Sequence, residues 1–182
     1  MFNINDQEKI DIIELDCRNE ANAMRSILEN FNFQVRIHYI GNVQHLISIM
    51  KEPNYLHRIA IISCHGSNEG LLLPDLAPDI EQKMPFHKLI TPENFDSFLS
   101  LNKQLIINTG CCLGNTNFAR TFINKGATAY IGSTNYTEAN SATLFVINFL
   151  YHYLCKKKAL SKSHALAANI DEETRLFKLS TS

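Results

Sequence analysis

Two periodicities alternate along the chain. Short runs rich in β-branched and other apolar residues are typical of buried strands, whereas longer stretches carry apolar residues three and four positions apart, as one face of a helix does. Because several of the short runs are nearly all apolar, the alternation predicts an α/β fold with a parallel sheet at its centre. The predicted strands are Ile10–Leu15, Phe33–Ile40, Arg58–Ser63, Gln104–Asn108 and Ala127–Ile131, and the predicted helices are Glu20–Phe31, Val43–Lys51, Pro92–Leu101 and Asn115–Lys125, the last ended by Gly126.

The C-terminal third is predicted to hold a long helix, a short helix and an edge strand. Thr137 is the predicted N-cap of a helix whose apolar face reaches Leu154. A short helix is expected near Ser161–Asn169, and Arg175–Leu179 alternates polar and apolar residues as an edge strand does. The longest connection, Gly66–Ile90, contains three of the five prolines, and long connections in compact domains are often functional.

Composition and charge narrow the class of protein. A chain of 182 residues with 45% apolar and 19% charged residues is expected to form one domain, residues 1–182. Its 17 basic and 18 acidic residues give a net charge of −1, so neither nucleic acid nor a membrane is an expected partner. The N-terminus lacks the basic start and apolar run of a signal peptide. Five cysteines, two of them adjacent, do not resemble a disulfide framework, which favours the reducing cytoplasm.

Chemistry-bearing residues follow two of the predicted strands. One apolar strand runs into His65 and Gly66, and the next runs into Thr109, Gly110 and Cys111. Because the carboxyl ends of parallel strands meet at one edge of a sheet, the imidazole and the thiol are expected to become neighbours. A thiol that passes its proton to a histidine is a nucleophile, and the N–H groups of Gly66 and Cys111 are candidate donors to the oxyanion that such an attack creates.

Other interpretations of the same residues are weaker. Taken singly, a cysteine is often only a buried hydrophobic residue and a histidine only a hydrogen-bonding group. A zinc site formed by Cys64, His65, Cys111 and Cys112 is disfavoured, since adjacent pairs lack the two-residue spacing of structural zinc ligands. No metal and no cofactor is expected.

The sequence resembles the caspase-like cysteine peptidases of clan CD, most closely the bacterial CHAT branch near separases and gingipains. The resemblance rests on His65-Gly66 after an apolar strand, on Gly110 to Gly114 matching the pattern Ala-Cys-x-x-Gly, and on the run from Phe118 to Ser133. It extends over most of the chain from Ile59 onward. The resemblance implies a three-layer α/β sandwich, with a mostly parallel central sheet of five to six strands and helices on both faces.

The resemblance also implies a function. The chain would be a cysteine endopeptidase with Cys111 as nucleophile, His65 as base, and Gly66 and Cys111 forming the oxyanion hole. Its partners would be a protein or peptide substrate and a regulatory protein, in a bacterial defence or regulated cell-death pathway with, for example, a gasdermin-like substrate.

Substrate selectivity stays open at this stage. Candidate substrate contacts are Asp16, Arg18, Thr109 and Ser133. Thr109 stands where caspases carry glutamine, and Asp16 and Arg18 have opposite charges, so the preferred residue before the cut is not fixed. The alternative function is a catalytically silent adaptor that binds partner proteins, against which the retained cysteine and histidine argue.

Overall fold

The central layer of the molecule is a six-stranded sheet. The structure is a computed structural model, and it describes residues 7–182. The strands lie in the order β2-β1-β3-β6-β7-β8, and all neighbours are parallel except β7 and β8. The predicted mostly parallel α/β sheet is therefore confirmed. The strands are β1 (Lys9–Leu15), β2 (Gln34–Tyr39), β3 (Ile59–Cys64), β6 (Leu105–Asn108), β7 (Ala129–Ser133) and β8 (Phe177–Thr181).

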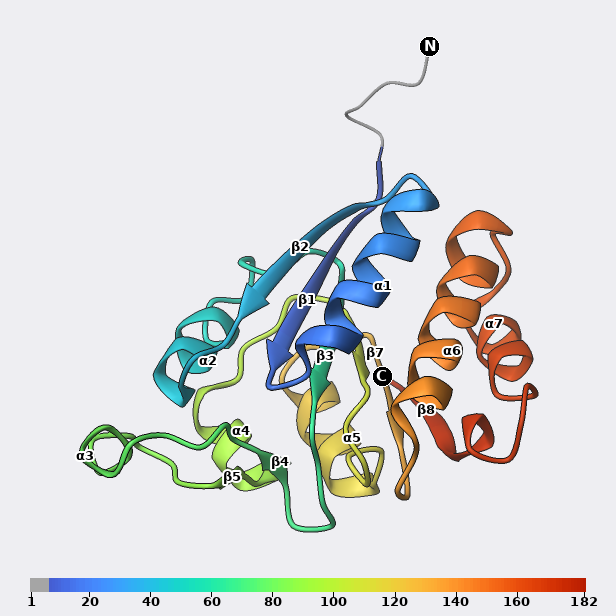
Figure 1. The fold of residues 1–182 in the computed structure, drawn as a ribbon. Helices are drawn as coiled ribbons and strands as arrows, with labels where there is room; N and C mark the ends of the chain where they lie inside the picture. The colour runs from blue at the N-terminus through green and yellow to red at the C-terminus, as the bar shows by residue number, and fades with distance from the viewer. Residues whose placement is uncertain (1–6) are drawn as a thin grey trace.

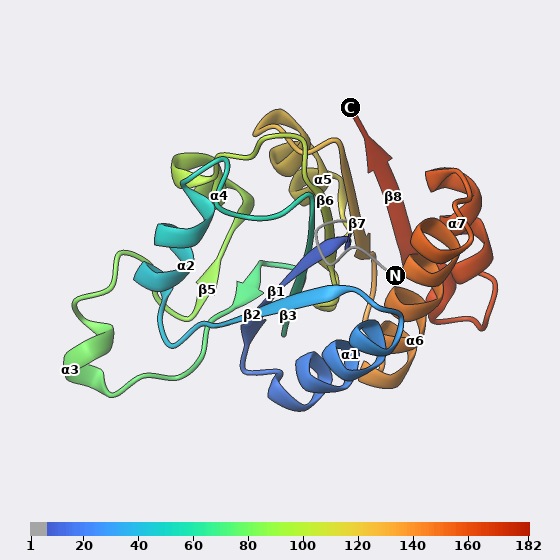
Figure 2. The same cartoon turned by 90° about the horizontal axis from the view of Figure 1, so that it is seen from above.

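Helices cover both faces of this sheet, which gives three layers (Figures 1 and 2). Helices α2, α4 and α5 pack on one face and α1, α6 and α7 on the other. Successive strand residues point to opposite faces, so Ile62 packs in the first core and Ile61 in the second. The helices are α1 (Arg18–Asn30), α2 (Val43–Met50), α3 (Pro78–Glu81), α4 (Pro92–Phe98), α5 (Thr116–Asn124), α6 (Ala139–Leu150) and α7 (Leu160–Ala167).

Smaller elements complete the chain. The predicted long connection after β3 contains the hairpin β4 (Leu71–Leu72) and β5 (Leu89–Ile90) as well as the short α3. A π-helical turn, Tyr151–Cys155, continues α6, and a 3₁₀ turn, Thr174–Leu176, precedes β8. Leu71 and Ile90 of the hairpin are buried in the core that α2, α4 and α5 cover, so the connection after β3 packs onto the main fold (Figure 1).

The predicted elements all exist, with differences at their ends. Helix α4 stops at Phe98 because the next residue, Leu99, is extended with ψ 130°. The predicted N-cap Thr137 was wrong: Glu138 precedes the first residue of α6, and no side chain caps that end. Gly126 does end α5, with a φ of +107° that favours glycine.

A buried carboxylate on β1 joins β1 to β2 and to the segment just before β3. Asp11 on β1 is fully buried and accepts hydrogen bonds from Arg36 Nε at 2.6 Å and from the His57 backbone N–H at 2.6 Å. The ring of His38 lies 2.9 Å from the same carboxylate. Burial alone would raise the pKa of Asp11, but the hydrogen bonds from His38, Arg36 and His57 outweigh it and lower the pKa to about 2. The ionised form is therefore the one that the fold stabilises.

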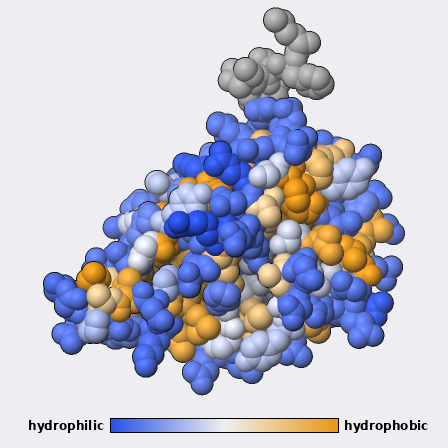
Figure 3. All heavy atoms as spheres, viewed as in Figure 1, coloured by the Kyte–Doolittle hydropathy of each residue, from blue (hydrophilic) through white to orange (hydrophobic). Residues whose placement is uncertain are grey.

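The outer surface is mostly polar. On the face seen in Figure 3, apolar side chains form separate spots among polar ones. The exposed large apolar residues come from well-separated parts of the chain, including Tyr55 and Leu144. Within residues 7–182, no helix combines the length and the apolar character needed to cross a bilayer.

Candidate active site

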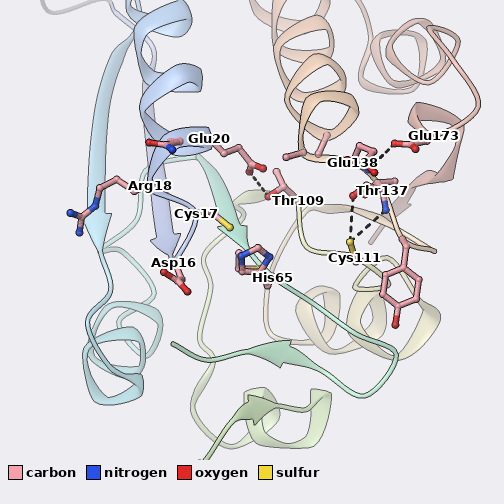
Figure 4. A pocket seen from close by; sticks show the side chains of 15 residues that line it. Asp16, Cys17, Arg18, Glu20, His65, Thr109, Cys111, Thr137, Glu138 and Glu173 are labelled. Atoms are coloured by element: carbon pink, nitrogen blue, oxygen red, sulfur yellow. Dashed lines mark hydrogen bonds between the residues drawn. The ribbon is translucent and has the colours of Figure 1, made fainter. Parts of the chain in front are cut away.

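A cleft of about 750 Å³ opens at the carboxyl ends of β1, β3 and β6. The sheet order changes direction here, since β2 lies on one side of β1 and β3 on the other. Ligands of open α/β sheets bind at such a position. Figure 4 shows the side chains of this cleft, which come from the loops after β1, β3, β6 and β7, from the starts of α1 and α6, and from the segment before the 3₁₀ turn Thr174–Leu176. Among them are Asp16, Cys17, Arg18, Glu20, Cys64, His65, Thr109, Cys111, Tyr136, Thr137, Glu138 and Glu173.

The loop that carries Cys111 is fixed by backbone contacts. The Asn108 side-chain oxygen accepts a hydrogen bond from the Gly110 N–H at 2.9 Å, which forms the exit from β6. The Gly114 N–H donates to the Ser133 carbonyl at 2.6 Å. A β-carbon at Gly114 would overlap the Gly132 carbonyl oxygen, so only glycine lets the loop lie against β7. The cysteine is therefore held on a short, rigid turn between β6 and α5.

The loops of His65 and Cys111 touch one another. A β-carbon built on Gly66 would overlap the Cys111 carbonyl oxygen and lie 2.7 Å from Leu113 Cγ. His65 follows β3, which pairs in parallel with β6. The imidazole is exposed and Cys111 is half-buried, and both side chains border the same cleft (Figure 4). Folding thus brings together two residues that are far apart in sequence.

The sulfur of Cys111 is held by the backbone of the loop before α6. The Thr137 N–H donates to Cys111 Sγ at 3.5 Å, and the thiol lies 3.5 Å from the Thr137 carbonyl oxygen, to which it donates. Within residues 7–182, no hydrogen bond joins Cys111 to His65. In this conformation the thiol is oriented by Thr137 rather than by the imidazole.

Two backbone donors beside the sulfur are unused. The N–H groups of Gly66 and Cys111 donate no hydrogen bond within the described part of the chain. The neighbouring amides are engaged: the N–H of Ser67 donates to Gly70 and that of Cys112 to Asn135. Unpaired amides beside a nucleophile are the donors that an oxyanion requires.

The other thiols near the cleft are held in the protonated form. Burial, and after it the negative charges of Glu20 and Glu14, raises the pKa of Cys17 to about 12. Burial also raises the pKa of Cys64 well above its ordinary value and that of Cys112 to a smaller extent. Because the thiolate is the reactive form, these three cysteines are poor nucleophiles.

The residues predicted to contact substrate fall into two groups. Asp16, Arg18 and Thr109 line the cleft together with His65. Ser133 is fully buried, its hydroxyl donates to the Asn135 carbonyl at 2.9 Å, and it is absent from the cleft wall. Its observed role is to shape the turn after β7.

Three acidic residues of the cleft walls, Glu20, Glu138 and Glu173, were not predicted as site residues from the sequence. Glu20 lies in the first turn of α1. The wall facing it comes from the loop before α6, with Glu138, and from the segment before the 3₁₀ turn Thr174–Leu176, with Glu173. The Glu138 N–H donates to Glu173 Oε2 at 2.7 Å. Within residues 7–182, no group of three or more His, Cys, Asp or Glu side chains is arranged to hold a metal ion.

The fold is similar to that of known caspase-like peptidases of clan CD. Saccharomyces cerevisiae separase, in its complex with securin, matches 98% of this chain with a TM-score of 0.62 and 9% identity. Porphyromonas gingivalis RgpB, in a complex of its pro- and mature domains, matches 96% with a TM-score of 0.58 and 11% identity. A secreted C11 cysteine protease from Bacteroides thetaiotaomicron, bound to an irreversible peptide inhibitor, matches 87% with a TM-score of 0.51 and 10% identity.

These similarities define a class of fold. The chain has a caspase-like α/β fold, as the resemblance predicts. It spans 12%, 47% and 57% of the lengths of those three chains. The sequence matches no protein-family model and no curated protein. At such low identities the likeness concerns the fold alone.

Proposed function

We propose that the chain is a cysteine endopeptidase that cuts proteins through Cys111 and His65. The observation that carries this proposal is the contact between the two loops at Gly66: the thiol and the imidazole border one cleft, and the two touching loops each contribute an unpaired amide, from Gly66 and from Cys111. The caspase-like fold adds support, since the three similar structures are peptidases of that class.

The proposed reaction begins with a substrate peptide bond above the cleft. Cys111 Sγ leaves its contact with Thr137, passes its proton to His65 and attacks the carbonyl carbon. The negative oxygen accepts hydrogen bonds from the N–H groups of Gly66 and Cys111. His65 then gives its proton to the departing amine, which leaves a thioester on the sulfur. Water, deprotonated by His65, hydrolyses that thioester and regenerates the thiol.

A cleavage profile tests this function. A peptide library with every residue type before the scissile bond is incubated with the purified protein, and the cut positions are identified by mass spectrometry. We expect cleavage by the unmodified protein and its loss in C111A. The matched control is C155A, which removes an exposed thiol that lies outside the cleft. An uncut library contradicts the proposal and favours an adaptor, whereas cutting that survives in C111A contradicts the assignment of Cys111 as the nucleophile.

The proposed biological setting starts from the resemblance to the caspase-like peptidases. We propose that residues 1–182 act as one peptidase domain under the control of a regulatory protein. The similar separase and RgpB structures are complexes with securin and with a pro-domain, respectively, which supports such a regulator. A place in bacterial defence or regulated cell death, with a gasdermin-like substrate, remains part of the proposal. The five free cysteines support a reducing, cytoplasmic location.

A further inference from the structure

The turn that carries Cys111 leaves the amide of the cysteine itself free. Before it, the Thr109 N–H donates to the Ile62 carbonyl at 3.0 Å. After it, the Cys112 N–H donates to the Asn135 carbonyl at 3.1 Å. The Cys111 N–H donates no hydrogen bond within residues 7–182. Such an amide can serve an oxyanion well only if its direction is fixed before the reaction begins.

The residue before the cysteine does not fix that direction by itself. A β-carbon at Gly110 would lie 2.6 Å from Leu113 Cδ1 and 2.9 Å from Cys64 Sγ, so the crowded turn has room only for glycine. Glycine, however, has the widest choice of backbone dihedral angles. Because Gly110 links the two peptide planes, the plane that bears the Cys111 N–H has to be fixed by another group.

The side chain of Asn108 is that group. Its Oδ1 accepts a hydrogen bond from the Gly110 N–H at 2.9 Å, and Cys64 Sγ donates to the same oxygen at 3.4 Å. Burial raises the pKa of Cys64 well above its ordinary value, so the thiol keeps the proton that it donates. Because both partners are donors, they determine which end of the side-chain amide faces Gly110.

Asn108 is itself fixed by the sheet. It is the last residue of β6, it is fully buried, and it pairs with Ile62 of β3 and Gly132 of β7. The other residues of this strand, Leu105–Ile107, are apolar, and asparagine is disfavoured in strands. Strand formation therefore does not explain a buried amide at this position, whereas the contact with Gly110 does.

We infer that Asn108 is a positioning residue, which holds the Gly110 N–H and thereby keeps the Cys111 N–H free and in a fixed direction for the oxyanion. This inference rests on the proposed peptidase function. Asn108 does not line the cleft, so it acts through the turn and not by touching substrate. Without it, kcat should fall on the order of 10- to 100-fold with KM nearly unchanged, which is less than the loss of a whole oxyanion donor costs.

A pair of matched ligands isolates the oxyanion. Labelled peptides carry the sequence before the preferred cut of the library and end in an aldehyde or in the corresponding alcohol. Cys111 Sγ forms a bond to the aldehyde carbon, the π electrons of the C=O bond move to its oxygen, and the thiol proton moves to His65. The alcohol has no carbonyl carbon and binds without a new bond. Fluorescence polarisation gives the two Kd values, and the ratio of alcohol to aldehyde measures stabilisation of the oxyanion.

Variants at position 108 remove or restore the acceptor oxygen. N108L and N108A lack it, and N108D has an oxygen in its place. The control N148L changes a half-buried asparagine on α6, outside the cleft. We expect the Kd ratio to fall on the order of 10- to 100-fold in N108L and N108A, and to stay near that of the unmodified protein in N108D and N148L. Partial unfolding of a variant affects both ligands equally and cancels in the ratio.

The outcomes separate this inference from the peptidase function. A ratio that falls in N108L and N108A, but not in N108D or N148L, supports the inference. An unchanged ratio in N108L and N108A, or an equal fall in N108D, overturns it while the peptidase function stands. If the library is left uncut, or if the unmodified protein binds aldehyde and alcohol equally, the peptidase proposal fails and this inference fails with it.

Discussion

Replacing Asp11 with asparagine is expected to destabilise the fold in a pH-dependent manner. Asp11 is fully buried and its pKa is lowered from 3.8 to about 2. A shift of nearly two units corresponds to about 2.5 kcal/mol, at roughly 1.4 kcal/mol per unit. Arg36, one of its partners, is 41% exposed, so solvent screens part of that interaction and we expect a loss of about 1–3 kcal/mol for D11N at pH 7. For a domain of this size that loss lowers Tm by about 3–9 °C.

The sign of the pH effect follows from the direction of the shift. Because the folded state holds the pKa of Asp11 below its ordinary value, its contribution is complete above about pH 4 and is lost as the pH falls toward 2. Urea unfolding between pH 2 and 7 should therefore show a decline at low pH that is smaller in D11N. The control is E29Q, which breaks the exposed pair of Glu29 with Arg25 and should cost less than about 0.5 kcal/mol. If D11N matches the unmodified protein at pH 7, or keeps its full acid decline, the reasoning is refuted.

Three further predictions concern the loops of the cleft. In G66A, the new methyl group displaces the Cys111 carbonyl, so we expect kcat/KM on the preferred library peptide to fall on the order of 100-fold, whereas G41A, at an open position, should retain activity. Under iodoacetamide at pH 7.5, peptide mapping should find Cys155 modified while Cys17 and Cys64 stay intact. Burial raises the pKa of Cys17 to about 12 and that of Cys64 well above its ordinary value, whereas Cys155 is exposed and the charges of Lys156 and Lys157 oppose the rise of its pKa; equal labelling would contradict this. Y130F removes the buried hydrogen bond to the Leu113 carbonyl and should cost about 1–2 kcal/mol in urea unfolding, and an unchanged midpoint would argue against that bond.

The sequence predicts the sheet well because its strands are short apolar runs. Buried strands such as Ile59–Cys64 need side chains that suit both cores, and that requirement is visible in a single sequence. His65 and Cys111 follow two such strands, β3 and β6, and because these strands are parallel neighbours, the two residues could be predicted to lie at one edge of the sheet. Segment 66–90 is different: its two strands, β4 and β5, have two residues each, and two residues carry no periodicity.

The walls of the cleft were less predictable, for two physical reasons. The contact of Cys111 with Thr137 joins the cysteine sulfur to backbone groups 26 positions away, and such contacts depend on loop conformation rather than on the type of residue that supplies the backbone. A glutamate in the first turn of a helix, such as Glu20, is also favoured by the helix dipole alone. What sets Glu20 apart from other glutamates at helix starts is that the hydroxyls of Ser63 and Thr109 donate hydrogen bonds to its carboxylate. Those contacts exist only in the folded chain.

The cooperation of His65 with Cys111 is tested most directly by a mechanism-based electrophile. A peptidyl acyloxymethyl ketone with a permissive sequence is added to the protein, and the rate and position of the adduct are determined by mass spectrometry. We predict a single adduct on Cys111, formed at a similar rate in the control H87A, whose histidine is exposed and outside the cleft, and at least about 100-fold more slowly in H65A. Labelling of another cysteine, or an unchanged rate in H65A, would contradict the account.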